Sequence, residues 1–325
     1  MLVLSAAEVA ALLDLDALAD ALQAAMAELS AGLASVPPRV AAQVPGRDAM
    51  LAAMPAYLPS AGALTAKLVS LFPRNQDCPT HHALICCFDP ATGTPVAVID
   101  GTYVTAARTA AGSVVATRLL ARPGASRVTV IGTGVQARAH ARALARLPGV
   151  RAVQVAGRDQ SKARALAAEL RAAGVPAQAA SSVEDAVRSA DVVCAATHAP
   201  SPVLRREWLR PGTHVNSVGY NNSGDGEVDS ATVRDALVVV ESRAAALAPY
   251  PAGAVELLRA IERHVIDAGR VTEVGEVAAG TAPGRAGGAQ LTLYKSVGVA
   301  VQDAAAAALV LAAARERGAG TSVTV

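Results

Sequence analysis

Hydrophobic and polar positions follow two different patterns along this 325-residue chain. Residues 40–99 contain short β-rich pieces, such as LTAKLVSLF and PVAVID, which prolines and glycines separate. That pattern is typical of an antiparallel sheet with hairpins. From residue 127 onward, short apolar strands alternate with helices rich in alanine and leucine. This alternation predicts a parallel, doubly wound sheet.

Helices are predicted on either side of the antiparallel region. Ser5 and Glu8 have the spacing of a capping box at the start of a first helix, and residues 15–33 form a second, amphipathic helix. Thr102 is expected to cap a long helix that reaches Ala121. The stretch 291–315, LTLYKSVGVAVQDAAAAALVLAAAR, is predicted to form one long apolar helix that returns to the first domain.

These elements together predict an α/β protein with two domains. A Rossmann doubly wound parallel sheet is expected over residues 113–290. A discontinuous α+β domain is expected from residues 1–112, and residues 291–325 complete it.

A glycine-rich turn follows the first strand of the parallel region, in the sequence RVTVIGTGVQARAHARALAR. Gly132, Gly134 and Ala137 have the G-x-G-x-x-A spacing of a dinucleotide-binding turn. Gly132 would allow the tight turn, Gly134 would let a pyrophosphate approach the backbone, and Ala137 would let the helix pack close to the sheet. The free amides at the start of the helix would bind the phosphates.

The end of the second strand indicates which nucleotide is bound, because this position reads the adenine ribose. Gly157 stands where an NAD-binding protein has an acid, and Arg158 follows it. A guanidinium matches the 2′-phosphate of NADP in a bidentate manner. We therefore favour NADP(H). NAD(H) is the alternative, because Asp159 would reach the ribose if the register slipped by two residues, and Arg158 would then be a surface arginine.

Composition and charge exclude several classes of protein. The formal net charge of +2 and the lack of a basic patch argue against nucleic-acid binding. No charged secretory start and no stretch long enough to cross a bilayer stand out. The four cysteines have neither zinc spacing nor the density of a disulfide scaffold. We expect a soluble, reduced, cytoplasmic protein with no metal site.

Isolated charges stand out in the predicted first domain because it contains few of them. Strand alternation places Lys67 on the same face as Thr65 and Val69, within LTAKLVSLF. A lysine there is either an edge residue that extends to water or a desolvated catalytic group, and the pattern alone favours the former. Arg39 and Arg108 pose the same question.

Four segments stand out when they are read together: AKLVSLFPRN, DGTYVTAARTAAGS, VIGTGVQA and YKSVGVAVQD. Together they resemble the ornithine cyclodeaminase/mu-crystallin family. The resemblance covers nearly the whole chain, and the order and spacing of the segments are as specific as the motifs. It implies a Rossmann domain for NAD or NADP and a homodimer built through the sheet of a first domain that also binds the substrate.

The resemblance also implies roles for single residues. Arg39 and Arg108 match the arginines that hold the substrate carboxylate, and Lys67 matches the catalytic lysine. Nearby arginines would lower the pKa of Lys67 and help it to give up a proton. Further positions match residues that contact the pyrophosphate or line the path to the nicotinamide: Gly134, Val135 and Gln136 for the former, and Thr197, Val218 and Ser296 for the latter.

The chain departs from the family pattern in the segment SVGYNNSGDGEVDS. Gly219, Gly224 and Glu227 fit the pattern G-x-D-x-x-G-x-x-E, but Asn221 stands at the aspartate position. An amide cannot take a proton from a substrate ammonium, as the oxidation of an amino acid requires, whereas reduction of a preformed imine needs no such base. Asp225 would replace the missing carboxylate only if the loop were arranged differently.

The favoured hypothesis is an NADPH-dependent reductase of a C=N bond next to a carboxylate, such as pyrroline-2-carboxylate or piperideine-2-carboxylate. The alternatives are an NAD-dependent ornithine or lysine cyclodeaminase or amino-acid dehydrogenase, and a non-catalytic binder of a small ligand. His81 and His82 precede a strand. Whether one of them lines the substrate pocket is left open by the sequence.

Overall fold

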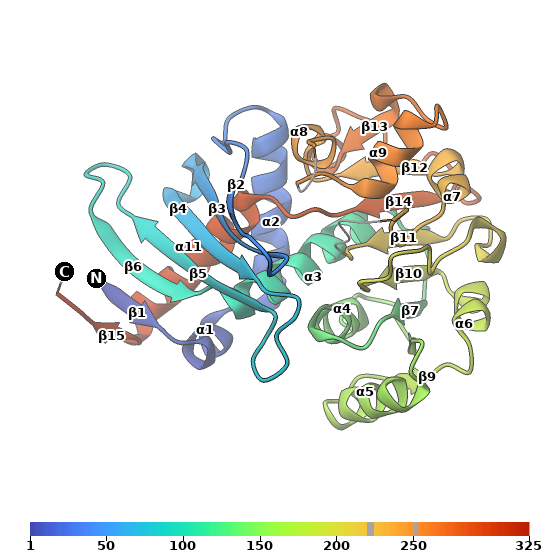
Figure 1. The fold of residues 1–325 in the computed structure, drawn as a ribbon, viewed down its shortest axis with the longest axis horizontal. Coiled ribbons are helices and arrows are strands. Elements are labelled where there is room, and N and C mark those ends of the chain that lie inside the picture. Colours follow the sequence, from blue (N-terminus) through green and yellow to red (C-terminus); the bar gives the residue numbers. More distant parts are fainter. Residues whose placement is uncertain (220–223, 250–251, 325) are drawn as a thin grey trace. The chain divides into compact units, whose positions relative to one another are not determined.

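The computed structural model describes residues 1–219, 224–249 and 252–324. In it the chain forms two compact units. Unit 1 comprises Met1–Arg108 and Gly298–Val325, and unit 2 comprises Thr109–Val297. The helix α3 (Gly101–Leu120) contains the boundary between them. Figure 1 shows each unit with its own sheet and its own set of helices.

Unit 1 is built on a seven-stranded sheet whose strand order is β15-β1-β6-β5-β4-β3-β2. Neighbouring strands from β2 to β6 are antiparallel, as predicted, whereas β1 pairs with β6 in parallel. The strands are β1 (Leu2–Leu4), β2 (Val40–Val44), β3 (Ala49–Leu58), β4 (Ala63–Leu71), β5 (His81–Phe88), β6 (Pro95–Asp100) and β15 (Thr321–Ser322).

Three helices complete unit 1: α1 (Ala6–Leu12), α2 (Leu15–Ser30) and α11 (Ala300–Arg317). Ser5 and Glu8 form the predicted capping box of α1. The α11 helix packs on α2, β3 and β4, and ten of its residues, mostly alanines, are buried. Small side chains let it approach the sheet closely, so the face of β3 and β4 that it covers is a core face.

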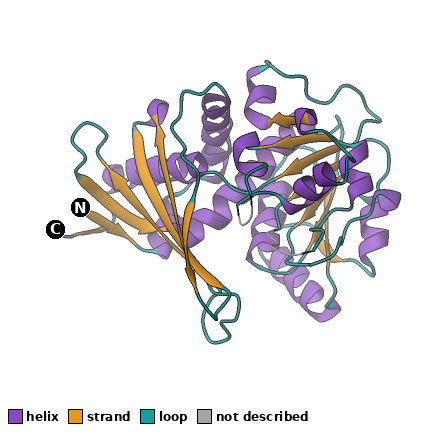
Figure 2. Cartoon of the chain, turned by 45° about the horizontal axis from the view of Figure 1, so that its top comes forward, coloured by secondary structure: helices purple, strands orange, loops and turns teal. Residues whose placement is uncertain are grey.

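Unit 2 is the predicted Rossmann-like, doubly wound α/β unit. Its eight strands are all parallel, in the order β13-β12-β14-β11-β10-β7-β8-β9. Figure 2 shows helices packed around these strands. The elements are β7 (Arg127–Ile131), α4 (Val135–Ala145), β8 (Ala152–Ala156), α5 (Gln160–Ala172), β9 (Ala177–Ala179), α6 (Val183–Ser189), β10 (Val192–Ala195), β11 (His214–Ser217), α7 (Ser230–Asp235), β12 (Leu237–Val240), α8 (Arg243–Ala246), α9 (Val255–Glu262), β13 (Val271–Glu273), α10 (Val274–Ala279) and β14 (Thr292–Lys295).

The prediction of one helix over residues 291–315 is wrong. Residues Thr292–Lys295 form β14, an inner strand of the parallel sheet, and α11 begins only at Ala300. Gly298, with a φ of +75°, turns the chain between the two elements. An apolar run of this kind suits a buried strand as well as a buried helix, and its periodicity does not separate them. Consequently β14 belongs to unit 2, not to the domain that residues 291–325 were expected to complete.

Within the described part of the chain, no helix is both long and apolar enough to cross a membrane.

Candidate active site

A buried lysine lies on the core face of the unit 1 sheet. Along β4, the side chains of Thr65, Lys67 and Val69 are buried, whereas the intervening Leu68 is exposed. The pleat of the strand produces this alternation, which is the one expected from the sequence. Lys67 is only 2% exposed and lies on the face that α11 covers, so it is a desolvated lysine and not an edge residue.

Lys67 forms an ion pair with a carboxylate that comes from the other end of the chain. Its Nζ lies 2.8 Å from Oδ2 of Asp303, which is in the first turn of α11 and is 1% exposed. The other oxygen of the same carboxylate, Oδ1, accepts a hydrogen bond of 3.2 Å from Nε of Arg108 on α3. One buried carboxylate thus contacts both cations.

Two guanidinium groups converge on the turn that precedes α11. Arg39 donates from Nη2 to the carbonyl oxygen of Gly298 over 2.8 Å. Arg108 packs against the same glycine and donates from Nη1 to Oε1 of Gln302 over 2.8 Å. The structure therefore brings Arg39, Lys67 and Arg108 together within unit 1.

The electrostatics of this cluster favour a lysine that can release its proton. Burial lowers the pKa of Lys67 to about 8, and repulsion from Arg108 and Arg39 acts in the same direction, while attraction to Asp303 opposes it. Burial by itself raises the pKa of Asp303, but Lys67 and Arg108 outweigh that effect and hold it below its usual value. Lys67 is therefore mostly protonated at neutral pH and becomes a neutral amine in mildly alkaline solution.

One of the two histidines flagged in the sequence lies near this cluster. Burial lowers the pKa of His81 to about 4, and the charges of Lys67 and Arg108 contribute to the lowering. His81 begins β5 and is half-buried, whereas its neighbour His82 is exposed. His81 is therefore a neutral imidazole at physiological pH and adds no charge to the site.

Unit 2 gathers the other predicted residues at the carboxyl ends of its central strands. Ile131, Ala195, Ser217 and Lys295 are in register across the neighbouring strands β7, β10, β11 and β14. Each predicted residue follows its strand within a few positions: Gly132 and Gly134 after β7, Thr197 after β10, Val218 after β11 and Ser296 after β14. In open α/β sheets, ligands bind at this edge.

The turn after β7 has the geometry that the glycine spacing predicts. Gly132 has a φ of +125°, which side-chain-bearing residues rarely adopt, and Ala137 is fully buried in the helix that follows. Gly134 caps α4 with no side-chain hydrogen bond, and nothing lies within 4 Å of the position that a Cβ would take there. The amides of Val135 and Gln136, at the start of α4, therefore lie where a pyrophosphate is bound in this type of turn.

The structure shows which residues follow β8, the strand whose end contacts the adenine ribose in folds of this type. Strand β8 ends at Ala156, so Gly157 occupies the expected acidic position and the exposed Arg158 comes next. Asp159 caps α5 and accepts hydrogen bonds from the backbone of Ser161 and Lys162. Asp159 therefore serves as a helix cap through its Oδ1.

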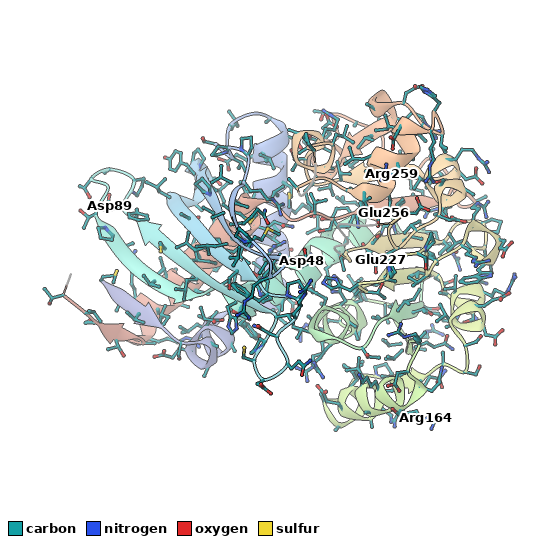
Figure 3. All side chains as sticks on the ribbon, in the orientation of Figure 1. Asp48, Asp89, Arg164, Glu227, Glu256 and Arg259 are labelled. Atoms are coloured by element: carbon teal, nitrogen blue, oxygen red, sulfur yellow. The ribbon has the colours of Figure 1, made fainter. Side chains whose placement is uncertain are left out.

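A buried ionic network fixes the chain beyond β11. Glu227, with no exposed surface, accepts hydrogen bonds from the backbone N–H groups of Thr197 and Gly219. Lys295 donates to the carbonyl oxygen of the same Gly219 over 2.9 Å and to Glu256 over 3.1 Å. The backbone N–H of Glu227 in turn donates to Glu256, and Figure 3 labels both carboxylates in unit 2. Burial raises the pKa of Glu227, an effect that Lys295 opposes.

Both polar backbone groups of Gly219 are thus held in place two residues before Asn221. Asn221 itself lies outside the described residues. Asp225, the alternative candidate for the missing carboxylate, forms an exposed ion pair with Arg263 at 2.7 Å.

Four buried polar residues of these clusters were not predicted: Glu256, Lys295, Gln302 and Asp303. Lys295, Gln302 and Asp303 lie in YKSVGVAVQD, one of the segments that carry the family resemblance. The signal that could have found Asp303 is a charged residue in an otherwise apolar, alanine-rich segment, because such a residue needs a buried partner.

Comparison with known proteins identifies the family of this chain. A family model for the ornithine cyclodeaminase/mu-crystallin family matches residues 1–318. The chain belongs to this family. Among its members, the mouse ketimine reductase mu-crystallin is 36% identical over 294 residues, which are 89% of each chain.

Solved structures of the family superpose closely on this one. The Thermococcus litoralis Δ1-pyrroline-2-carboxylate reductase, in complex with NADH and L-proline, has a TM-score of 0.94 at 35% identity, over 99% of this chain and 100% of that one. An archaeal alanine dehydrogenase dimer with bound NAD has a TM-score of 0.92 at 31% identity, over 100% of this chain and 99% of that one. The predicted family and the predicted fold class are therefore confirmed.

Proposed function

We propose that this protein is an NAD(P)H-dependent oxidoreductase that reduces a C=N bond adjacent to a carboxylate. A cyclic imino acid, such as pyrroline-2-carboxylate or piperideine-2-carboxylate, is the substrate. The observation that carries the proposal is the buried Lys67, whose pKa is lowered to about 8, in one cluster with Arg39 and Arg108. Sequence similarity to a ketimine reductase and structural similarity to a pyrroline-2-carboxylate reductase support the proposal.

The three cationic side chains have two different roles. Arg39 and Arg108 hold the substrate carboxylate, because a guanidinium matches a planar carboxylate in bidentate fashion. That contact fixes the imine next to Lys67, whose ammonium donates a proton to the imine nitrogen while the imine carbon accepts a hydride. A proton donor with a pKa close to the operating pH suits this task.

The residues at the edge of unit 2 suit a dinucleotide. When bound, a reduced nicotinamide nucleotide supplies the hydride. Gly134, Val135 and Gln136 hold the pyrophosphate. The lack of a side-chain cap at the start of α4 and the open space at Gly134 support this assignment. Thr197, Val218 and Ser296 lie beyond the neighbouring strands and line the nicotinamide path.

NADPH is the proposed reductant in preference to NADH. The support comes from Gly157 and Arg158 at the ribose position and from the engagement of Asp159 as a helix cap. The solved relatives contain NADH or NAD, so this chain would differ from them in the adenosine end that it accepts.

The residue at position 221 disfavours reactions that start from an amino acid, namely cyclodeamination and oxidation. A cyclodeaminase or an amino-acid dehydrogenase must take a proton from a substrate ammonium, and Asn221 cannot accept one there. Reduction of a preformed imine requires only a proton donor, which Lys67 supplies. Lys67, Arg39 and Arg108 also argue against a non-catalytic binder, because a mere ligand pocket has no use for a lysine with a lowered pKa.

We further propose that the protein is a homodimer that assembles through the outer face of the unit 1 sheet. Leu84, Leu68, Ala53 and Val40 are paired in one row across β5, β4, β3 and β2. Leu84 is 51% exposed, Leu68 38% and Val40 66%. Such a continuous apolar row is typical of an interface. An alanine dehydrogenase of the family is a dimer.

A spectrophotometric screen tests the proposed activity. The purified protein is given NADPH or NADH together with cyclic imino acids, and separately with 2-oxo acids and amines, and oxidation is followed at the nicotinamide absorbance. We expect turnover with the cyclic imino acids and faster turnover with NADPH. Inertness toward every imine by protein that still binds NADPH would favour the ligand-binder alternative, and ammonia release from ornithine or lysine would favour the cyclodeaminase.

A further inference from the structure

We propose that Asp303 is a positioning residue that keeps Lys67 protonated and ties this proton donor to the arginine that holds the substrate carboxylate. This inference rests on the proposed reductase function and deepens it. Asp303 is not among the site residues that the sequence motifs predict.

The geometry places Asp303 between two groups with different tasks. Its Oδ2 is 2.8 Å from Nζ of Lys67, and its Oδ1 accepts from Nε of Arg108 at 3.2 Å. Lys67 comes from β4, Arg108 from α3 and Asp303 from α11, and all three side chains are at most 7% exposed. The carboxylate therefore fixes the distance between the proton donor and the carboxylate-binding guanidinium, far from bulk water.

The charges around Lys67 show why a carboxylate is needed there. The strand β5 presents His81, which is neutral at physiological pH, α3 presents Arg108, the segment before β2 presents Arg39, and α11 presents Asp303. Burial and both arginines drive the proton off Lys67, and among these groups only Asp303 retains it.

The proton on Lys67 is consumed in the proposed reaction. The π bond of C=N breaks as the carbon accepts a hydride, with the two electrons coming from oxidation of NAD(P)H to NAD(P)+. The nitrogen takes the proton of the Lys67 ammonium and becomes a secondary amine, and Lys67 is left as a neutral amine that solvent must reprotonate. Without Asp303, the neutral form of Lys67 would prevail before the substrate arrived, and the nitrogen would have no donor.

The arrangement also predicts an effect of substrate binding. The substrate carboxylate brings a second negative charge to Arg39 and Arg108 and partly cancels their repulsion of the Lys67 proton. The pH profile of kcat reports the substrate complex, and that of kcat/KM reports the free enzyme. The alkaline limb of the kcat profile, where the rate falls as the pH rises, should therefore lie at a higher pH than that of the kcat/KM profile.

The test is the pH dependence of imine reduction by Asp303→Asn, measured with pyrroline-2-carboxylate and NADPH from pH 5 to pH 10. Loss of the negative charge should move the alkaline limb of kcat/KM to a lower pH by about 1 to 3 pH units, the range that a neighbouring opposite charge produces. Activity should be recovered in acid, and Asp303→Glu should restore a limb close to that of the wild type.

A second variant keeps the test decisive if Asp303→Asn does not fold. Gln302 lies in the same helical turn and accepts from Nη1 of Arg108 over 2.8 Å, so Gln302→Glu adds a negative charge with little change in shape. It should move the limb to a higher pH. Glu316→Gln, at an exposed position near the end of α11, removes a charge from the same helix and should leave the limb unchanged.

The outcomes separate the two proposals. A wild-type protein that reduces no imine contradicts the proposed function itself. A wild type with an alkaline limb, together with folded Asp303 and Gln302 variants whose limbs do not move, overturns the role of Asp303 only. So does a folded Asp303→Asn variant that is inactive at every pH, because the recovery in acid is then missing.

Discussion

Arg39 and Gly298 are joined by a hydrogen bond of 2.8 Å, from Nη2 of the arginine to the carbonyl oxygen of the glycine, across 259 positions of the chain. The same glycine has a φ of +75°, and a Cβ there would lie 2.7 Å from Nη1 of Arg108. Gly298 is therefore the point at which both guanidinium groups approach the backbone. A side chain at this position would displace the pair proposed to bind the substrate carboxylate.

Gly298→Ala should weaken substrate binding. Displacement of Arg108 should raise the KM for the imino acid by about 10- to 100-fold, since a misplacement of about 1 Å has effects of this size. The Kd for NADPH should stay unchanged. The measurement is steady-state kinetics together with a fluorescence titration of the nucleotide.

Gly318→Ala is the matched control for this substitution. Gly318 ends α11 with a φ of +62°, and nothing lies within 4 Å of its Cβ position. Both variants should lose about 1 kcal/mol of stability, because alanine disfavours positive φ. Only Gly298→Ala should raise the KM, and an equal rise in both variants would show that backbone strain alone is responsible.

Lys67 should make imine reduction sensitive to alkaline pH. The pKa of Lys67 is lowered to about 8, so the ammonium is present below that pH and is lost as the pH rises through it. The kcat/KM of the wild type should therefore fall above about pH 8. Lys67→Met should lower kcat by about 100- to 10,000-fold, the contribution typical of general acid catalysis, without weakening NADPH binding. A wild-type profile that stays flat to pH 10 would exclude Lys67 as the proton donor.

The placement of Lys67 could be predicted from the sequence because it depends on a local property. Side chains alternate between the two faces of a strand, and Leu68 is exposed where Lys67 is buried. What the pattern could not decide was whether the buried face was dry. That depends on α11, which lies more than two hundred residues away and covers β4.

Long-range pairings explain what was missed. Asp303 is 195 residues from Arg108, and no motif spacing joins residues so far apart. The short strands β1 and β15, of three and two residues, carry too few positions for a periodicity. The sequence of β14 does not distinguish a strand from a helix, because burial on both sides of the strand removes the polar positions that would reveal its period.

Arg158 should determine the preference for NADPH. Arg158→Ser removes the guanidinium proposed to bind the 2′-phosphate and should raise the KM for NADPH by about 10- to 100-fold, in keeping with a charge-assisted contact of about 1.5 to 3 kcal/mol. The KM for NADH should change little. Arg164→Ser is the control, because Arg164 is an exposed arginine on α5. Equal changes in both variants would indicate a general effect of charge and not recognition of the phosphate.

The outer face of the unit 1 sheet should hold the proposed dimer together. Leu68→Glu and Leu84→Glu each place a charge in the apolar row, at positions that pair directly across β4 and β5. Each should weaken association by about 2 kcal/mol or more if the row forms the centre of the interface. The measurement is the dissociation constant from analytical ultracentrifugation. Leu33→Glu, at a position 67% exposed and outside the row, is the control.

The pleat of β4 lets Leu68→Glu change the proposed interface without placing a charge next to Lys67. Leu68 and Lys67 are adjacent in sequence but point to opposite faces, so the new carboxylate lies on the far side of the sheet from the site. The variant should therefore become monomeric while the alkaline limb of its kcat/KM stays near pH 8. A limb that moved with the oligomeric state would show that assembly changes the surroundings of Lys67, and an unchanged dimer would place the interface on another surface.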